Sequence, residues 1–224
     1  MAPLSDAKVL DSWEHNAVQW TSAVRENRIE SRSLVTNQAI IDAILSRSPS
    51  TLLDIGCGEG WLVRALGELG VSGIGLDAVP ALIEQAARTG GGDFRVMSYE
   101  QIANGELDVR VDCAVANFSL IGKEAVDALI STVPKLLAPG GSFVIQTLHP
   151  RTDMGGLAYE DGWRTGNWTG FSSDFSDPAP WYFRTMETWT DLIQETGCRV
   201  FEVREPLHPY TKELASAVFI ADFA

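Results

Sequence analysis

Basic residues are scarce in this chain: 17 Lys and Arg stand against 30 Asp and Glu, and the formal net charge is −13. No stretch carries five consecutive basic residues. A nucleic-acid substrate needs clustered cations to meet its phosphates, so the composition disfavours nucleic acid as a partner. Of the 224 residues, 45% are hydrophobic and 21% are charged, which is typical of one sizeable globular domain.

Cysteine and histidine are also scarce, with three of each. The cysteines are scattered and odd in number, which argues against a disulfide framework. No histidine lies near another histidine or near a cysteine pair, so we expect no metal site. The N-terminus has early acidic residues and no apolar run, and we therefore expect neither a signal peptide nor a membrane anchor. A cytoplasmic protein without membrane contact is the expectation, and the oligomeric state stays open.

From residue 51 onward, short apolar segments alternate with segments of helical periodicity. The pattern predicts strands at 52–55, 71–77, 94–99, 111–118, 142–149, 198–207 and 215–223. The first five of these strands are separated by helices, which predicts an α/β fold with a parallel sheet and helices on both faces. Ligands of such sheets bind beyond the carboxyl ends of the strands.

The most specific motif is "LLDIGCGEG", residues 52–60, in which an acid ends a strand and three glycines follow. A turn without side chains lets the backbone approach a ligand closely. The Gly-x-Gly-x-x-Gly turn of a dinucleotide site would need glycine at position 61, where the chain has Trp61. Two nearby carboxylates, Asp54 and Glu59, would also repel a pyrophosphate. A positively charged ligand is favoured, with a purely structural turn and an NAD-dependent dehydrogenase as alternatives.

At these residues the chain resembles the class I S-adenosylmethionine-dependent methyltransferases. A second acid, Asp77 in "GIGLDAVP", ends the next strand 23 residues after Asp54, and "DCAVANFSL" and "LLAPGGSFVI" match later motifs of the family. The resemblance covers roughly residues 50–150 and, more loosely, the last two strands. It implies a Rossmann-like, doubly wound sheet of seven strands, mostly parallel, with an antiparallel last strand and helices on both faces.

The resemblance also implies roles for matching residues. The glycines would pass beneath the methionine part of the cofactor, and Asp54 would organise its amino end. Asp77 would accept hydrogen bonds from both ribose hydroxyls. At Ser98 and Tyr99 many relatives have an acid, which leaves the adenine contacts less defined. The implied set for S-adenosylmethionine, with S-adenosylhomocysteine as product, is Asp54, Gly56, Cys57, Gly58, Gly60, Asp77, Ala78, Ser98, Tyr99, Asn117 and Phe118.

Residues 150–184 have no clear period and include eight aromatic side chains. A connection of this length is usually functional, so we interpret it as a lid over the acceptor, with a small satellite core as the alternative. Helical N-terminal residues 1–50 would add to the cover. The candidate acceptor-binding residues are Trp13, Trp20, Arg32, Trp163, Trp168, Trp181, Tyr182 and Arg184.

His149 is the candidate catalytic base, because it follows the fifth predicted strand in "TLHP" and imidazole titrates near neutrality. The alternative is a histidine that only holds the chain where it turns at Pro150. The chain is then one methyltransferase domain, 1–224, with an N-terminal cap (1–50), a cofactor-binding core (51–149), an insert (150–184) and a closing helix and hairpin (185–224).

The expected function is methyl transfer from S-adenosylmethionine to O or N of a small-molecule acceptor. The alternative is a non-catalytic module of the same fold that binds S-adenosylmethionine or S-adenosylhomocysteine. The sequence does not name the acceptor.

Overall fold

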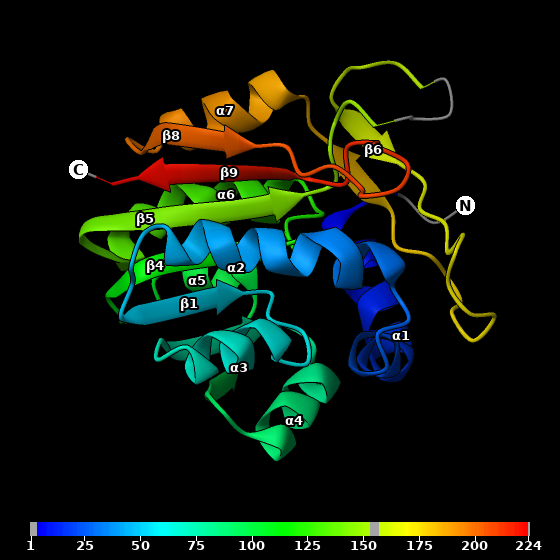
Figure 1. The fold of residues 1–224 in the computed structure, drawn as a ribbon, viewed down its shortest axis with the longest axis horizontal. Coiled ribbons are helices and arrows are strands. Elements are labelled where there is room, and N and C mark those ends of the chain that lie inside the picture. Colours follow the sequence, from blue (N-terminus) through cyan, green and yellow to red (C-terminus); the bar gives the residue numbers. More distant parts are fainter. Residues whose placement is uncertain (1–3, 153–156, 224) are drawn as a thin grey trace.

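The computed structural model describes residues 4–152 and 157–223 (Figure 1). Its centre is a seven-stranded sheet in the order β3-β2-β1-β4-β5-β9-β8. The sheet strands are β1 Thr51–Ile55, β2 Ser72–Asp77, β3 Asp93–Val96, β4 Val111–Asn117, β5 Leu137–Thr147, β8 Arg199–Arg204 and β9 Ala217–Asp222. The first five pair in parallel, and β9 is antiparallel to both β5 and β8. The predicted mostly parallel, Rossmann-like sheet is confirmed.

Helices cover both faces of the sheet. They are α1 Asp6–Arg25, α2 Asn37–Leu45, α3 Trp61–Glu68, α4 Pro80–Thr89, α5 Tyr99–Ala103, α6 Glu124–Thr132 and α7 Met186–Gln194, with a π-helical turn η1 Arg32–Thr36 and a 3₁₀ turn η2 Val133–Leu136. Figure 1 shows α2 in front of the sheet and α6 behind it. Neighbouring strand residues point to opposite faces, so Leu52 packs with α2 and α3 while Leu53 packs with α6.

The third strand is shorter than predicted, and Ser98 and Tyr99 belong to a helix instead. β3 ends at Val96, and Ser98 is the N-cap of α5. The Ser98 hydroxyl accepts from the Gln101 backbone N–H, and the Gln101 side chain accepts from the Ser98 N–H. This reciprocal capping pair begins a helix at a point where apolar spacing alone predicts a continuing strand.

The N-terminal helix and the insert lie together at the carboxyl end of the sheet. In Figure 1 the β1 and β5 arrows point towards α1 and towards the ribbon of β6 Gly162–Arg164 and β7 Trp181–Phe183. These two short strands pair antiparallel within the insert. Residues 153–156 of the predicted insert lie outside the described residues. The edge at which ligands bind in this class of fold is therefore covered by the two segments that lie outside the strand–helix alternation.

The insert is fastened to α1 through the Asn16 side chain, which is fully buried. Its Nδ2 donates to the Ser176 carbonyl at 2.8 Å, and its Oδ1 accepts from the Ser176 N–H at 3.0 Å. Nearby, the Ser12 hydroxyl donates to the Asp177 carbonyl, and the Lys8 ammonium bonds the carboxylates of Asp11 and Asp177. At the first residue of α1, the Asp6 carboxylate accepts from two backbone N–H groups at the start of α6.

Among the described residues no helix is both long enough and apolar enough to cross a membrane.

We predict that Asn16→Ala loosens the insert, because the Ser176 N–H loses its partner and the Ser176 carbonyl keeps only the hydrogen bond from Trp168 Nε1. The expected loss of unfolding free energy is about 1–3 kcal/mol, and amide hydrogen exchange over residues 168–177 should become faster. Val18→Ala is the matched control, because Val18 lies on the same helix with 68% of its surface exposed. Unchanged exchange in the insert of the Asn16 variant would show that this side chain does not hold the two segments together.

Candidate active site

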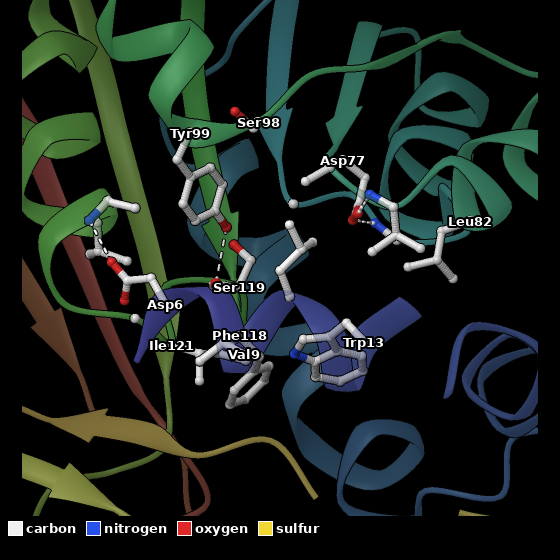
Figure 2. A pocket seen from close by; sticks show the side chains of 18 of the residues that line it. Asp6, Val9, Trp13, Asp77, Leu82, Ser98, Tyr99, Phe118, Ser119 and Ile121 are labelled. Carbon is white, nitrogen blue, oxygen red and sulfur yellow. Dashed lines mark hydrogen bonds between the residues drawn. The ribbon is translucent and has the colours of Figure 1, made fainter. Parts of the chain in front are cut away.

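A cavity of about 320 Å³ lies between the strand ends and α1; we call it the strand-end cavity. Figure 2 shows Val9 and Trp13 of α1 on one side of it, and Asp77, Ser98 and Tyr99 on the other. The strand side of its lining comes from the ends of four adjacent strands, β3, β2, β1 and β4. Asp77 and Ala78 lie at the end of β2, Ser98 and Tyr99 after β3, and Asn117 and Phe118 at the end of β4, while Gly56 and Gly58 follow β1. The fold thus brings together predicted cofactor residues that are far apart in the sequence.

Asp77 holds the turn after β1 in place. Its Oδ2 accepts from the Gly58 N–H at 2.8 Å and its Oδ1 accepts from the Val79 N–H at 2.9 Å. Burial raises the pKa of Asp77, while these two N–H groups oppose that shift. Because each carboxylate oxygen can accept more than one hydrogen bond, both oxygens keep capacity for a ligand. The bond to Val79, the N-cap of α4, is the capping contact that the purely structural alternative anticipates.

The glycine turn has positive φ at Gly56, Gly58 and Gly60. A Cβ on Gly56 would lie 2.3 Å from Cβ of Ser119, so this position requires glycine for packing alone. A Cβ on Gly58 would meet only Trp20, with Nε1 at 3.5 Å, and Gly58 lines the cavity. The turn therefore serves both purposes: Gly56 fits the strands together, and Gly58 leaves backbone open to a ligand.

Asp54, at the tip of β1, is a buried carboxyl whose Oδ1 has no hydrogen-bond partner among the described groups. Burial, and then the charge of Asp77, raise its pKa to about 8, although Arg32 opposes the shift. Arg32 comes from the π-helical turn, and burial lowers its pKa to about 10 despite the charges of Glu59 and Asp54. Its Nη2 is also buried without a partner in the described chain. π-Helical turns are frequent at functional sites.

Glu59 is fully enclosed and is paired by two arginines. Its Oε2 accepts from Arg25 Nε at 2.9 Å and from Arg64 Nη2 at 2.6 Å. Arg25 also donates to the Gln85 carbonyl and the Thr89 hydroxyl, so one ion-pair network joins α1, the glycine turn and α4. The Oε1 atom of Glu59 has no partner among the described groups. The negative charge that argued against a pyrophosphate is thus balanced within the protein.

A second cavity, of about 580 Å³, adjoins the first, and we call it the aromatic cavity. Both cavities are lined by Gly56, Gly58, Asn117, Phe118 and Ile121, together with Trp13 and Trp20 of α1. Phe118 has φ +55°, a left-handed conformation that is costly for an aromatic residue. The Oδ1 of Asn117 is buried without a described partner. The strained backbone of Phe118 and the unpaired side-chain oxygen of Asn117 therefore lie together where the two cavities meet.

Most of the predicted acceptor residues line the aromatic cavity: Trp13, Trp20, Arg32, Trp168, Trp181, Tyr182 and Arg184. Trp163 lines neither cavity, and its ring packs against Tyr182 at 5.6 Å between centroids. The Arg184 guanidinium is buried and bonded to the Gly122 and Lys123 carbonyls and to Asp127. Its donors hold the segment before α6 and Asp127 within that helix, so they are already occupied within the protein. The predicted satellite core is also present, since Trp168 packs on Phe175 at 4.7 Å.

His149 lines the aromatic cavity, and both of its ring nitrogens have partners. Nδ1 accepts from the Arg151 backbone N–H at 3.1 Å, and Nε2 lies 2.8 Å from Glu205 Oε1. This pattern places the proton of a neutral imidazole on Nε2, because the backbone N–H can only donate. The contacts give His149 a structural task at the turn that starts the insert, and its task as a base stays a prediction.

Several lining residues were not predicted from the sequence. Ser119 lines the strand-end cavity and donates its hydroxyl proton to the Ile55 carbonyl at 2.6 Å. Trp61 and Thr36 line the aromatic cavity, and the Trp61 ring lies under the Arg32 guanidinium at 4.9 Å. Thr36 is four residues after Arg32, which is the one local signal that could have linked them.

Comparison with known proteins agrees with this geometry. The chain spans less than half of the length of the curated relatives it matches. One is a ubiquinone biosynthesis O-methyltransferase of Brucella anthropi, 34% identical over 113 residues, or 48% of this chain and 44% of that protein. Among solved structures, 1,6-didemethyltoxoflavin-N1-methyltransferase of Burkholderia thailandensis is 20% identical, with a TM-score of 0.65 over 100% of this chain and 93% of that one.

A methyltransferase of Haloferax volcanii, solved in complex with the activator Trm112, aligns over 96% of both chains at 15% identity and a TM-score of 0.68. These two structural likenesses show the fold. The methyltransferase-domain family itself matches residues 17–203, which is most of the chain. The protein therefore belongs to the methyltransferase-domain family, as the motif from Asp54 to Gly60 predicts.

Proposed function

We propose that the chain transfers the methyl group of S-adenosylmethionine to O or N of a small-molecule acceptor. The observation that carries the proposal is the shared wall of the two cavities, formed around Gly58, Asn117 and Phe118. A methyl donor whose nucleoside lies in the strand-end cavity would face an acceptor in the aromatic cavity across this shared wall, which Gly56, Ile121, Trp13 and Trp20 complete. Methyl transfer needs little beyond that alignment and the exclusion of water.

The strand-end cavity fits the nucleoside of the donor. Asp77 is at the end of β2 with acceptor capacity for two hydroxyls, and Ala78, Val79 and Leu82 give an apolar face beside it. The Ser98 hydroxyl and the Tyr99 ring line the same cavity, although Tyr99 already donates its hydroxyl proton to the Ser119 carbonyl at 2.9 Å. The adenine contacts of this pair remain part of the proposal.

The methionine end of the donor carries a carboxylate and an ammonium, and the unpaired buried atoms match that pair of charges. Arg32 lines the aromatic cavity and offers a guanidinium nitrogen without a partner among the described groups, which suits the carboxylate if the methionine end of the donor extends into that cavity. The Asn117 and Glu59 side chains offer oxygen acceptors without partners, which suit the ammonium. We therefore assign Arg32 to the cofactor, and not to the acceptor for which the sequence suggested it.

The aromatic cavity is the proposed acceptor site. Its volume exceeds that of the strand-end cavity, and indole and phenyl rings from α1 and the insert form much of its wall. The ubiquinone biosynthesis and didemethyltoxoflavin enzymes named above act on small molecules according to their names, which supports an acceptor of that kind. The cover by residues 150–184, the division into cap, core, insert and closing hairpin, and a cytoplasmic location are parts of the same proposal.

The first test has two parts. It asks whether the purified chain binds S-adenosylhomocysteine, and whether it forms S-adenosylhomocysteine from S-adenosylmethionine when an acceptor is present. We expect calorimetric binding at micromolar concentration, and release that rises above background with members of a panel of phenols, aromatic carboxylic acids and heterocyclic amines. Binding without release over the whole panel would instead support the non-catalytic module. No binding at millimolar ligand would contradict the proposal for the cofactor as well.

We predict that Gly58→Ala weakens S-adenosylhomocysteine binding at least tenfold, because the added methyl group enters the space over the glycine turn. The matched control is Gly105→Ala, where φ is +81° and nothing lies within 4 Å of the added Cβ. Both variants carry the cost of alanine at positive φ, so their melting temperatures should fall by similar amounts. Calorimetry and thermal unfolding of the pair separate lost space from backbone strain, and equal binding by both variants would refute the assignment.

We predict that Asp54→Asn stabilises the ligand-free protein near pH 7 and weakens cofactor binding. The folded chain holds a proton on Asp54 up to about pH 8, whereas an unfolded aspartate releases it near pH 4. Stability should therefore fall as pH rises between these values, and Asn should remove at least about 1 kcal/mol of that cost. Thermal unfolding at pH 5.5, 7 and 8.5 measures the difference.

Cofactor binding should show the opposite dependence on pH. A ligand with an ammonium and a sulfonium favours the ionised form of Asp54, so binding should release a proton and tighten as pH rises towards 8. Calorimetry in two buffers of different ionisation enthalpy counts the proton. In Asp54→Asn the proton release should decrease, and an undiminished release would show that another group supplies it.

A further inference from the structure

Four guanidinium, carboxyl or imidazole side chains line the aromatic cavity, beside the thiol of Cys57 and the phenol of Tyr182: Arg32, Glu59, His149 and Arg184. Three of them are already bonded within the chain. Arg184 is held by Asp127 and two carbonyls, His149 by Glu205 and a backbone N–H, and Glu59 by Arg25 and Arg64. The fourth, Arg32, is the residue that we assign to the methionine carboxylate.

The described lining residues therefore offer no evident general base that could take a proton from the methyl-accepting substrate. Using His149 Nδ1 would remove the partner of the Arg151 N–H. Protonating Glu59 would discharge a carboxylate that two guanidinium groups surround. Cys57 is buried, with its pKa raised by that burial and by the nearby acids, so its thiol stays protonated. No other described carboxylate or imidazole lines this cavity.

The cavity is instead rich in aromatic faces. They come from α1 (Trp13, Trp20), from the start of α3 (Trp61) and from the insert (Trp168, Phe171, Trp181). Aromatic faces present negative quadrupole density, so they attract flat rings and also a positive charge that lies over them. An anionic acceptor would find no described cation with a free donor once Arg32 is occupied. The wall thus favours a flat acceptor that is neutral before transfer and cationic after it.

We propose that the acceptor is a neutral aromatic nitrogen heterocycle that attacks through an unprotonated ring nitrogen, so that no protein base takes part; this rests on the proposed methyltransferase function. The ring-nitrogen lone pair forms the new N–C bond. The C–S bond breaks with its electron pair going to sulfur, which becomes a neutral thioether. The positive charge passes from sulfur to the ring, beneath the aromatic wall, and no proton moves in the step.

Three probes of the same two-ring shape test the charge preference. N-methylisoquinolinium, 2-methylnaphthalene and 2-naphthoate carry charges of +1, 0 and −1. Each is titrated into the full chain saturated with S-adenosylhomocysteine, whose own binding is measured first. We expect the cation to bind at least about tenfold more tightly than the neutral isostere, or about 1.4 kcal/mol. Equal binding, or no binding of the cation to a chain that does bind S-adenosylhomocysteine, overturns the inference and leaves the proposed function standing.

Turnover gives a second readout. We expect isoquinoline to yield N-methylisoquinolinium by mass spectrometry, at a rate above those of 2-naphthol and 2-naphthoic acid. The pH midpoint of the rate should follow the basicity of the heterocycle across substituted isoquinolines. Faster formation of the ether, or a midpoint that stays fixed whichever heterocycle is used, shows that a protein base works and overturns the inference. Faster formation of the ester shows that the site prefers an anionic acceptor and overturns it as well.

A pair of variants locates the effect in the wall. Trp181 lines the aromatic cavity, whereas Trp163, on the neighbouring strand of the same ribbon, does not. Trp181→Leu should lower the preference for the cationic probe about three- to tenfold while S-adenosylhomocysteine affinity stays within twofold. Trp163→Leu controls for damage to the ribbon and should keep the preference. An undiminished preference in the Trp181 variant would remove the wall as its source.

Discussion

The hydrogen bond from the Gly58 N–H to Asp77 Oδ2 joins the turn after β1 to the tip of β2, and the site is built around it. The turn has positive φ at Gly56, Gly58 and Gly60, a conformation that favours glycine at these alternate positions. The hydrogen bond also fixes the carboxylate of Asp77 at the edge of the strand-end cavity. The Gly56 and Cys57 N–H groups, which donate to the Leu76 carbonyl at 2.7 and 2.9 Å, hold the start of the same turn against β2.

The same turn links the site to the cover above it. Glu59, one residue after Gly58, pairs with Arg25 at the end of α1, and Trp20 of α1 lies over Gly58. The insert in turn is fastened to α1 through Asn16. The turn, α1 and the insert therefore form one connected structure, so that a change at the glycine turn can reach the wall of the aromatic cavity.

The sequence was sufficient for features that depend on local chemistry. The strand–acid–glycine pattern from Leu52 to Gly60 specifies a turn and a binding edge, and the alternation that follows specifies the sheet. It was insufficient where long-range partners decide. Arg184 has the composition of a ligand-binding residue, but Asp127 and two carbonyls, 57 to 62 residues away in sequence, occupy it. The partner of His149, Glu205, is 56 residues away, which no local pattern reveals.

The insert shows a second limit. Its aromatic residues have no period, so the sequence could not separate those that face the cavity from those that pack on each other. The structure divides them: Trp181 faces the cavity, Phe175 is buried, and Trp163 packs on Tyr182. The division is set by the β6–β7 ribbon and by the contact with α1, both of which form only in the folded chain. Both sequence interpretations, a lid and a satellite core, therefore describe part of the segment.

Buried polar atoms without hydrogen-bond partners lie close to the glycine turn, and their position bears on what the site binds. Native proteins leave few buried polar groups without partners, because each costs free energy. Here Asp54, Asn117, Glu59 and Arg32 each have such an atom, and the last three line the same cavity. A fold shaped by stability alone would pair them with each other or replace them with apolar residues. Their concentration beside the glycine turn is what a site prepared for a zwitterionic ligand requires, since polar groups already in place need no reorganisation when the ligand arrives.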